Sequence, residues 1–279
     1  MLVSRPPGPN SFGVDASLDL DPELVAAADQ NFIGSYEKLA EHQEAGSVQR
    51  FGSVTAFVSG LPISFLNGGI APGAATAADL EAAVEWLDER GHPYEIWIAE
   101  AFADAHDAAL TATGFERSAW PIPTMILRPP PKPPPPAAGV TVRAVEDAAG
   151  LEEHIAMQVE QGFPEAAARR MYSESFARDP DVRIYTAYLD GQAVGSSIAI
   201  RTGAVSGVYS VGTRPDARRR GVGTAATWAA VAAGVGWDAT IVALQSSEMG
   251  YDVYRDMGFE VLNRYALFHR VGGEAAAYS

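Results

Sequence analysis

The chain of 279 residues contains no cysteine. That absence excludes disulfide bonds, thiolate metal ligands and a cysteine nucleophile, and we expect no metal cofactor. Long apolar runs are also lacking. None approaches the roughly 20 residues that a membrane-spanning helix needs, and the opening stretch MLVSRPPGPNSF has no apolar signal core. We therefore expect a soluble, cytoplasmic protein with no membrane partner.

Positive charge is scarce as well, because 20 Lys and Arg residues stand against 35 Asp and Glu residues, a formal charge of −15. Such a surface repels phosphate backbones, so nucleic acid is a poor partner. Against this background Arg214, Arg218, Arg219 and Arg220 form a local basic cluster. A basic pocket in an acidic surface suits an anionic cofactor and a cationic second substrate, although acidic surfaces also serve solubility alone.

The basic cluster belongs to residues 209–224, YSVGTRPDARRRGVGT, which the pattern predicts as a strand, a short loop and a helix start. Residues 218–223 fit R-x-x-G-x-G. Two glycines allow close backbone approach, and the following helix offers its positive N-terminal end to an anion. The stretch therefore predicts a pyrophosphate site, although a short glycine pattern alone can also mark an ordinary loop.

The segments that follow this loop give the pattern its context. We predict a helix over residues 224–235, a buried strand over 240–245, a helix over 247–257 stopped by Gly258, and a last strand over 261–268. The second helix ends in YRDMGF, with Tyr254 first. With these two motifs, residues 140–270 resemble the GNAT acyltransferase family, whose acyl-CoA loop carries R/Q-x-x-G-x-G/A between a strand and a helix and whose later helix ends in Y-x-x-x-G-F.

The two halves of the chain resemble each other. The pair Gly114-Phe115 recurs 144 residues later as Gly258-Phe259. When the two halves are aligned with this offset, residues 67–70 correspond to residues 211–214. Such self-similarity indicates two copies of one fold. The whole chain thus resembles a tandem GNAT protein of the α/β class, an α+β mixed sheet in two domains, each a twisted, mostly antiparallel sheet flanked by helices.

We expect a degenerate first domain over residues 1–128, a linker over 129–139 and the catalytic domain over 140–279. The linker, PPPKPPPPAAG, has the composition of a stiff polyproline II segment, with a proline-rich recognition peptide as the alternative. In the first copy the phosphate loop is replaced by AATAAD, residues 74–79, which has neither Arg nor Gly and places Asp79 at the helix start. Leu110 stands where the second copy has Tyr254, so the first copy is predicted to be structural.

Further elements follow from local pattern. In the first half we expect helices over 22–32 and 36–42, strands over 48–59 and 63–70, and a capping box at residues 76–79 that opens a helix to Arg90. In the second half we expect helices over 148–161 and 164–177, then a hairpin turning at Asp190-Gly191.

The resemblance assigns the cofactor-binding residues. The backbone of Val211 would face the thioester carbonyl, Gly212 and Thr213 would follow the pantetheine arm, and Ser247 stands where the family often has Asn. The residues that would wrap the pyrophosphate are Arg218, Arg219, Arg220, Gly221, Val222, Gly223 and Thr224. An interior strand and a capped helix are the structural alternative for these segments.

Tyr254 is the predicted general acid, because a phenol with a pKa near 10 keeps its proton at neutral pH and can give it to a leaving thiolate. A core tyrosine is the alternative. Glu160 and His154, on a helix that borders the acceptor site in this family, are candidate general bases, although either is more often a surface residue and water can do the same work.

We expect an acetyl-CoA-dependent N-acetyltransferase that acts on a small, possibly cationic, primary amine, as a monomer or homodimer, with acetyl-CoA as co-substrate. A non-catalytic acyl-CoA-binding or sensing protein is the main alternative, and a purely structural pairing module is a more distant one.

Overall fold

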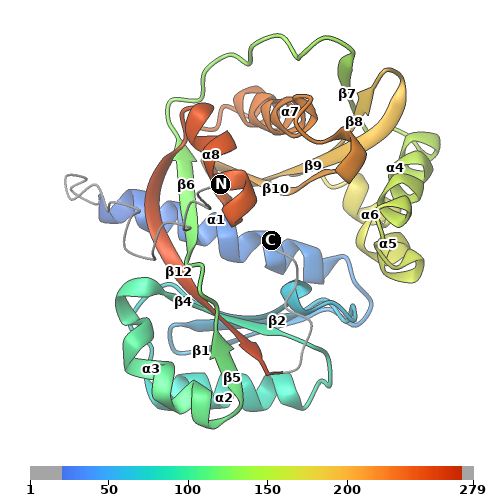
Figure 1. Cartoon of the computed structure of the whole chain (residues 1–279). Helices are drawn as coiled ribbons and strands as arrows, with labels where there is room; N and C mark the ends of the chain where they lie inside the picture. Colours follow the sequence, from blue (N-terminus) through green and yellow to red (C-terminus); the bar gives the residue numbers. More distant parts are fainter. Residues whose placement is uncertain (1–20, 272–279) are drawn as a thin grey trace, which may run out of the picture.

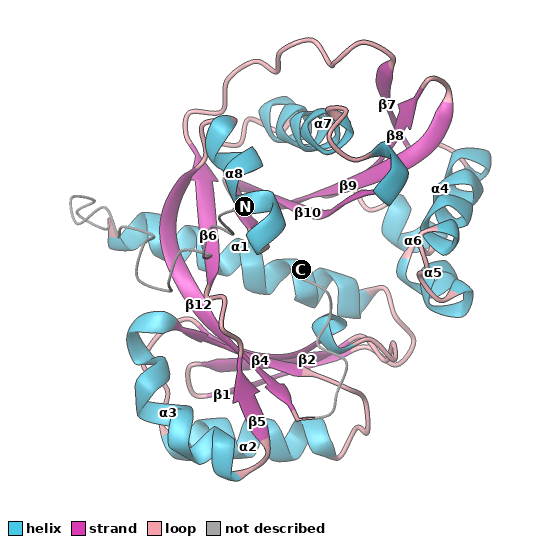
Figure 2. Ribbon diagram, viewed as in Figure 1, coloured by secondary structure: helices cyan, strands magenta, loops and turns pink. Residues whose placement is uncertain are grey.

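The computed structural model describes residues 21–271, which form a single mixed sheet flanked by helices (Figures 1 and 2). The strands are β1 (Ser47–Phe51), β2 (Val54–Val58), β3 (Asn67–Ala71), β4 (Glu95–Ala99), β5 (Phe115–Arg117), β6 (Ile122–Leu127), β7 (Val140–Ala144), β8 (Val182–Leu189), β9 (Gln192–Thr202), β10 (Val205–Thr213), β11 (Ile241–Gln245) and β12 (Glu260–Arg270). The helices are α1 (Pro22–Glu41), α2 (Ala77–Asp88), α3 (Glu100–Ala112), α4 (Ala148–Glu160), α5 (Glu165–Met171), α6 (Glu174–Ala177), α7 (Val222–Gly236) and α8 (Glu248–Asp256), with 3-10 turns η1 (Ser64–Leu66) and η2 (Pro215–Ala217). The mixed α/β class expected from the sequence is confirmed.

The order of the strands shows that the two halves exchange their last strands. The sheet runs β1-β2-β3-β4-β12-β6-β11-β10-β9-β8-β7, with β5 paired to β12. The last strand of the first half, β6, therefore pairs with β11 of the second half, and the last strand of the second half, β12, pairs with β4 of the first. Two pairs of adjacent strands are parallel, namely β3 with β4 and β10 with β11. The other ladders are antiparallel.

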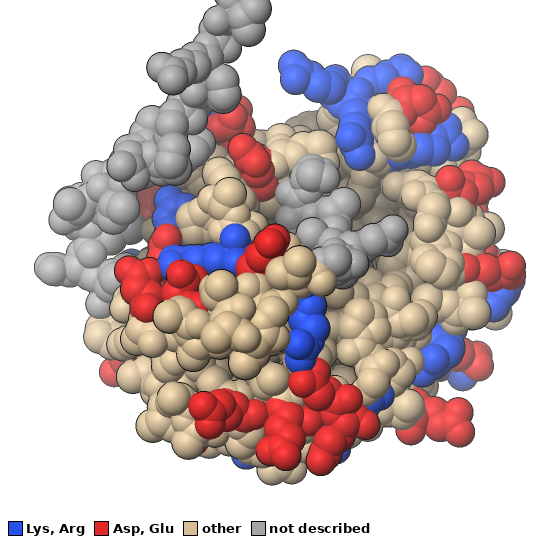
Figure 3. All heavy atoms as spheres, turned by 60° about the horizontal axis from the view of Figure 1, so that its bottom comes forward, with Lys and Arg blue, Asp and Glu red and all other residues tan. Residues whose placement is uncertain are grey.

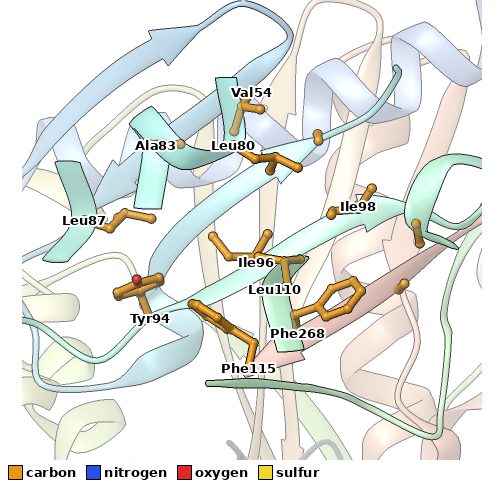
Figure 4. Packing of buried hydrophobic residues seen from close by; sticks show 14 of the residues in the cluster. Val54, Leu80, Ala83, Leu87, Tyr94, Ile96, Ile98, Leu110, Phe115 and Phe268 are labelled. Carbon is orange, nitrogen blue, oxygen red and sulfur yellow. The ribbon is translucent and has the colours of Figure 1, made fainter. Parts of the chain in front are cut away.

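The exchange also joins the hydrophobic cores. In the first half, α2 and α3 pack on β2 and β4 through Leu80, Leu110 and Ile96, all buried (Figure 4). Phe268 of β12 is fully buried in the same cluster. An aromatic ring of this kind buries 150 to 250 Å² of surface, so the second half supplies a substantial part of the first half's core.

Helix α1 crosses the middle of the molecule and binds both halves (Figure 1). The side chain of the fully buried Asn31 donates hydrogen bonds to the carbonyls of Ile200 (3.0 Å) and Val205 (3.3 Å), and its Oδ1 accepts one from the Tyr209 hydroxyl (2.7 Å). These partners lie on or beside strands of the second half, so α1 is fixed against that half by satisfied polar groups.

A second polar contact lies near the C-terminal end of α1. Lys38 Nζ is 3.0 Å and His42 Nε2 is 2.9 Å from Asp179 Oδ2. Burial works to raise the pKa of Asp179, but the hydrogen bonds from His42, the Asp181 backbone and Lys38 outweigh it and hold the pKa below its usual value.

Several sequence expectations for single elements were wrong. Residues 22–41 form one helix, not two. Gly34 lies within this helix at a close contact, where an added Cβ would be 2.9 Å from Thr202 Oγ1, so the glycine allows packing and does not end the helix. Residues 48–59 form a hairpin that turns at Gly52 (φ +54°). Residues 63–70 begin with the turn η1 before β3. The expected helix over 164–177 is broken after Met171, where Ser173 caps α6.

Other local predictions are confirmed. Thr76 and Asp79 form a capping box, with Asp79 N to Thr76 Oγ1 at 3.1 Å and Thr76 N to Asp79 Oδ2 at 3.2 Å. The hairpin turn has positive φ at both Asp190 (+51°) and Gly191 (+87°), as a two-residue turn between twisted strands requires. Gly258 follows the end of α8 at φ +94°.

The division into domains 1–128 and 140–279 stays a prediction. The segment between β6 and β7 contains no helix or strand and passes over α7 (Figure 1). Because each half holds a strand of the other, cutting this segment should leave the fold intact, whereas removing a half should not.

We predict that residues 140–279 expressed alone do not form a soluble folded protein, because β11 would lose β6 and β12 would lose three partners. Fragments 1–132 and 133–279, coexpressed as separate chains, are expected to copurify as one folded complex. Size-exclusion chromatography and circular dichroism of both preparations check this. A soluble, fully active 140–279 fragment would show that the first half is dispensable.

Candidate functional site

The sheet opens between β10 and β11. These parallel strands pair only from Val205 and Ile241 to Gly207 and Ala243, and β10 then continues to Thr213 paired with β9 alone. A register shift between Tyr209 and Gly212 against β9 marks a bulge. Within it Ser210 has φ +51°, and its carbonyl accepts a hydrogen bond from Ser196 Oγ (2.9 Å). Bulges of this kind redirect side chains and are common beside active sites.

A cavity of about 370 Å³ lies at this opening, between the two halves of the molecule. Its walls come from α1, η1 and β4 of the first half and from α4, β9, β10 and the start of α8 in the second. Among the predicted site residues, the cavity brings together Val211, Gly212, Ser247 and Tyr254. Its volume is in the range of sites for small molecules.

The predicted phosphate loop lies beyond the open end of β10. Gly221 precedes α7 in the left-handed conformation (φ +80°), and no side chain caps the helix. A Cβ at Gly221 would lie 2.9 Å from Ala137 Cβ, and one at Gly223 would lie 3.2 Å from Thr213 Oγ1. Both positions therefore favour glycine. Val222 is buried and Thr224 partly buried, so they anchor the start of the helix. An uncapped helix N-terminus behind glycines fits the pyrophosphate of an acyl-CoA.

The arginines of the loop are exposed but mostly engaged. Arg218 Nε donates to the Thr213 carbonyl (3.3 Å), and Arg220 is 3.2 Å from Asp190. Arg219 adopts φ +62° at the surface. These pairs are solvent-exposed and therefore weak, so the arginines can turn to an anionic ligand. One face of the molecule, shown in Figure 3, carries many acidic side chains.

Tyr254 lies on α8 with its ring edge toward Phe259, at 6.0 Å between ring centres. Burial raises the pKa of Tyr254 to about 12, with a hydrogen bond to Thr227 opposing the shift. Its hydroxyl therefore carries a proton throughout the neutral range. Ser247 opens the same helix, where its Oγ accepts from the Gly250 N–H (3.2 Å).

The two candidate bases lie outside the cavity lining. Glu160, at the end of α4, has a side chain 65% exposed and lies 3.8 Å from Arg214. His154 is fully buried, with Nδ1 2.9 Å from Thr186 Oγ1 and Nε2 3.3 Å from the Gln158 amide. Burial lowers the pKa of His154 to about 4, so it is neutral. The surface interpretation of His154 was therefore wrong, because the residue belongs to an internal polar network.

That network leads to cavity residues that the sequence analysis missed. Gln158 donates to the Tyr172 hydroxyl (2.9 Å), and both side chains line the cavity. Gln158 follows the singled-out His154 by one helical turn, and that spacing was the available signal. Gln245 at the end of β11 also lines the cavity, and no local pattern distinguishes it.

The corresponding place in the first half is closed. The Thr76–Asp79 capping box satisfies the start of α2 with the protein's own side chains. Strand β3 stays paired with β4 from Gly68 and Glu95 to its end. Leu110, the counterpart of Tyr254, is buried in the core.

Together, an opened parallel strand pair, a glycine loop at a helix start and a cavity beside them make up the candidate site. Residues 137–238 match the family model described as "Acetyltransferase (GNAT) domain". No curated protein sequence matches the chain.

Solved structures share the fold at low sequence identity. A GCN5-related N-acetyltransferase from Kribbella flavida matches at 19% identity and a TM-score of 0.64, over 91% of this chain and 96% of that one. A second from Sphaerobacter thermophilus matches at 19% identity and 0.58, over 89% and 92%. A tandem GNAT protein from the clavulanic acid biosynthesis pathway matches at 16% identity and 0.55, over 92% and 97%. Residues 137–238 therefore match the GNAT acetyltransferase domain, and the chain as a whole shares the fold of these solved structures.

Within 21–271, no helix is long and apolar enough to cross a membrane. The same part of the chain holds no cluster of three His, Cys, Asp or Glu side chains that could bind a metal ion.

We predict that acetyl-CoA binds once per chain and that Gly221→Asp weakens this binding about a hundredfold or more, because a carboxylate would oppose the pyrophosphate at close range. Titration calorimetry measures both affinity and stoichiometry.

Gly221→Asn is the matched control, since asparagine tolerates the same positive φ and meets Ala137 in the same way without a charge. Ala77→Asp, at the corresponding exposed position of the first half, should change nothing. Two equivalent sites, or equal affinity for both Gly221 variants, would contradict the assignment.

Proposed function

We propose that the protein is an acetyl-CoA-dependent N-acetyltransferase that acts on the primary amine of a small molecule, with the reaction in the second half. The observation that carries the proposal is the position of Tyr254, which is protonated at neutral pH and lines the same cavity as Val211 and Gly212 at the β10 bulge. The family of the domain at residues 137–238 supports the reaction class.

Each part of the site has a separate role in the proposed reaction. Residues 218–224 hold the pyrophosphate, and the backbone from Val211 to Thr213 holds the pantetheine arm and polarises the thioester carbonyl. Acetyl-CoA supplies an activated acetyl group. The amine nitrogen bonds to the acetyl carbon and loses its proton to water, while the carbon–sulfur bond breaks. Tyr254 gives its proton to the sulfur and regains one from water.

Water is the proposed proton acceptor because none of the described residues that line the cavity is an acidic or basic side chain. Glu160 is turned to Arg214 at the surface, and His154 is enclosed behind Gln158. A general base in contact with the amine is therefore not part of the proposal.

We predict that Tyr254→Phe lowers kcat by about 10²–10⁴-fold, or roughly 3–5 kcal/mol at the transition state, because the ring stays packed while the acidic proton is lost. Acetyl-CoA affinity should change little. Because the pKa of Tyr254 is about 12, its deprotonation should not reduce kcat between about pH 7 and pH 10.

Release of CoA thiol with a panel of amines measures turnover, and calorimetry measures acetyl-CoA affinity. Tyr251→Phe is the control, because it removes a hydroxyl from the same helix at a residue outside the cavity lining. If Tyr254→Phe binds acetyl-CoA normally and turns over within a few-fold of the parent, Tyr254 only packs. If the parent binds acetyl-CoA and acetylates no amine, the protein is a binder and not an enzyme.

A further inference from the structure

The cavity beside the proposed reaction site is uncharged. Among the residues that the structure describes, none that lines it is Asp, Glu, Lys, Arg or His. The wall supplied by the first half is largely aromatic and aliphatic, and it consists mainly of Phe32, Tyr36, Leu39, Phe65, Leu66 and Trp97. The second half adds further apolar side chains, including Phe163 and Phe176.

Three acidic or basic side chains on the elements that form these walls are buried, and each is engaged elsewhere. Asp29 of α1 accepts from the Tyr265 hydroxyl (2.8 Å) and the Asn263 amide (3.0 Å). Glu95 of β4 accepts from the Ser64 hydroxyl (2.9 Å). His154 of α4 is neutral and hydrogen-bonded to Thr186. No carboxylate is therefore available at the lining to pair with a second positive charge.

The polar atoms of the cavity belong mainly to the second half and are uncharged. Tyr172 and Gln158 form one hydrogen-bonded pair, and Ser210 lies at the β10 bulge. Gln245 Oε1 is buried and has no hydrogen-bond partner among the described residues, while its Nε2 is 3.5 Å from Thr124 Oγ1. A buried acceptor without a partner is costly in a protein interior, and an N–H of a bound ligand would satisfy it.

We propose, as a refinement that rests on the proposed function, that the acceptor is a small amine with an aromatic or branched aliphatic body, bound as the neutral free base. Its nitrogen lies at the β10 bulge, near Ser210 and Gln245, and its body packs against α1 and β4. Two constraints support this assignment. A charged ammonium in an uncharged cavity has no partner to offset the loss of its hydration, and apolar walls stabilise an apolar body. Polyamines and aminoglycosides would bring additional charges that this lining cannot pair.

The test compares amines of similar length with the unmodified protein. With acetyl-CoA, kcat/KM for 2-phenylethylamine should exceed that for 1,4-diaminobutane by roughly 10²-fold. The first amine gains by burying its aromatic ring, and the second loses because its second ammonium group would be buried without a partner. Preference for the diamine would overturn the assignment and leave the proposed function standing. Faster transfer from octanoyl-CoA than from acetyl-CoA would overturn it too, because the cavity would then hold the acyl chain.

A binding measurement keeps the assignment testable without turnover. In calorimetry with CoA present, N-acetyl-2-phenylethylamine should bind, and Phe163→Asp should weaken binding about tenfold or more by placing a carboxylate at the partly buried wall. Phe102→Asp is the matched control, because Phe102 is 39% exposed on α3 and does not line the cavity. Equal effects of the two variants, or no binding by the parent, would overturn the assignment. Amide binding by a protein that acetylates no amine would contradict the proposed function alone.

Discussion

The exchange of β6 and β12 between the halves is the constraint on which the rest of the molecule depends. A sheet with an unpaired inner edge would expose a row of backbone donors and acceptors, and each half avoids this by accepting the other's last strand. Phe268 of β12 consequently belongs to the core of the first half. Because the halves cannot separate without breaking four ladders, α1 and β4 are held at a fixed distance from β10, and the cavity between them is preformed.

The two halves differ in a few local features at matching places. In the first half, Thr76 and Asp79 satisfy the helix start, and β3 remains paired with β4. In the second half, Gly221 leaves the helix start uncapped, and β10 leaves β11 at a bulge. Positive φ at Ser210 and Arg219 adds strain that the first half does without at the matching places. Strain of this kind concentrates where a ligand is bound.

Sequence reasoning succeeded where the determinant is local. The capping box, the turn at Asp190-Gly191 and the stop at Gly258 each depend on a few adjacent residues, and the two motifs of the second half sufficed to indicate the superfamily. It failed where the determinant is distant. Two helices were expected over 22–32 and 36–42, whereas residues 22–41 form one, in which Gly34 packs against Thr202, 168 residues away. The strand exchange, the burial of His154 and the aromatic wall of the cavity likewise depend on contacts between the halves that no local pattern encodes.

The net charge of the chain says little about the chemistry of the cavity. A formal charge of −15 made a cationic acceptor a reasonable expectation, yet surface charge acts at long range on encounter, while a bound molecule interacts with the few groups that line its site. Here those groups are aromatic rings, hydroxyls and amides. Glu160, the acidic residue considered for catalysis, is turned outward and lies near Arg214 instead. In the proposed assignment, the acidic surface draws an ammonium toward the protein and the apolar cavity selects the amine, because a neutral nitrogen on an apolar body would enter it without leaving a charge unpaired.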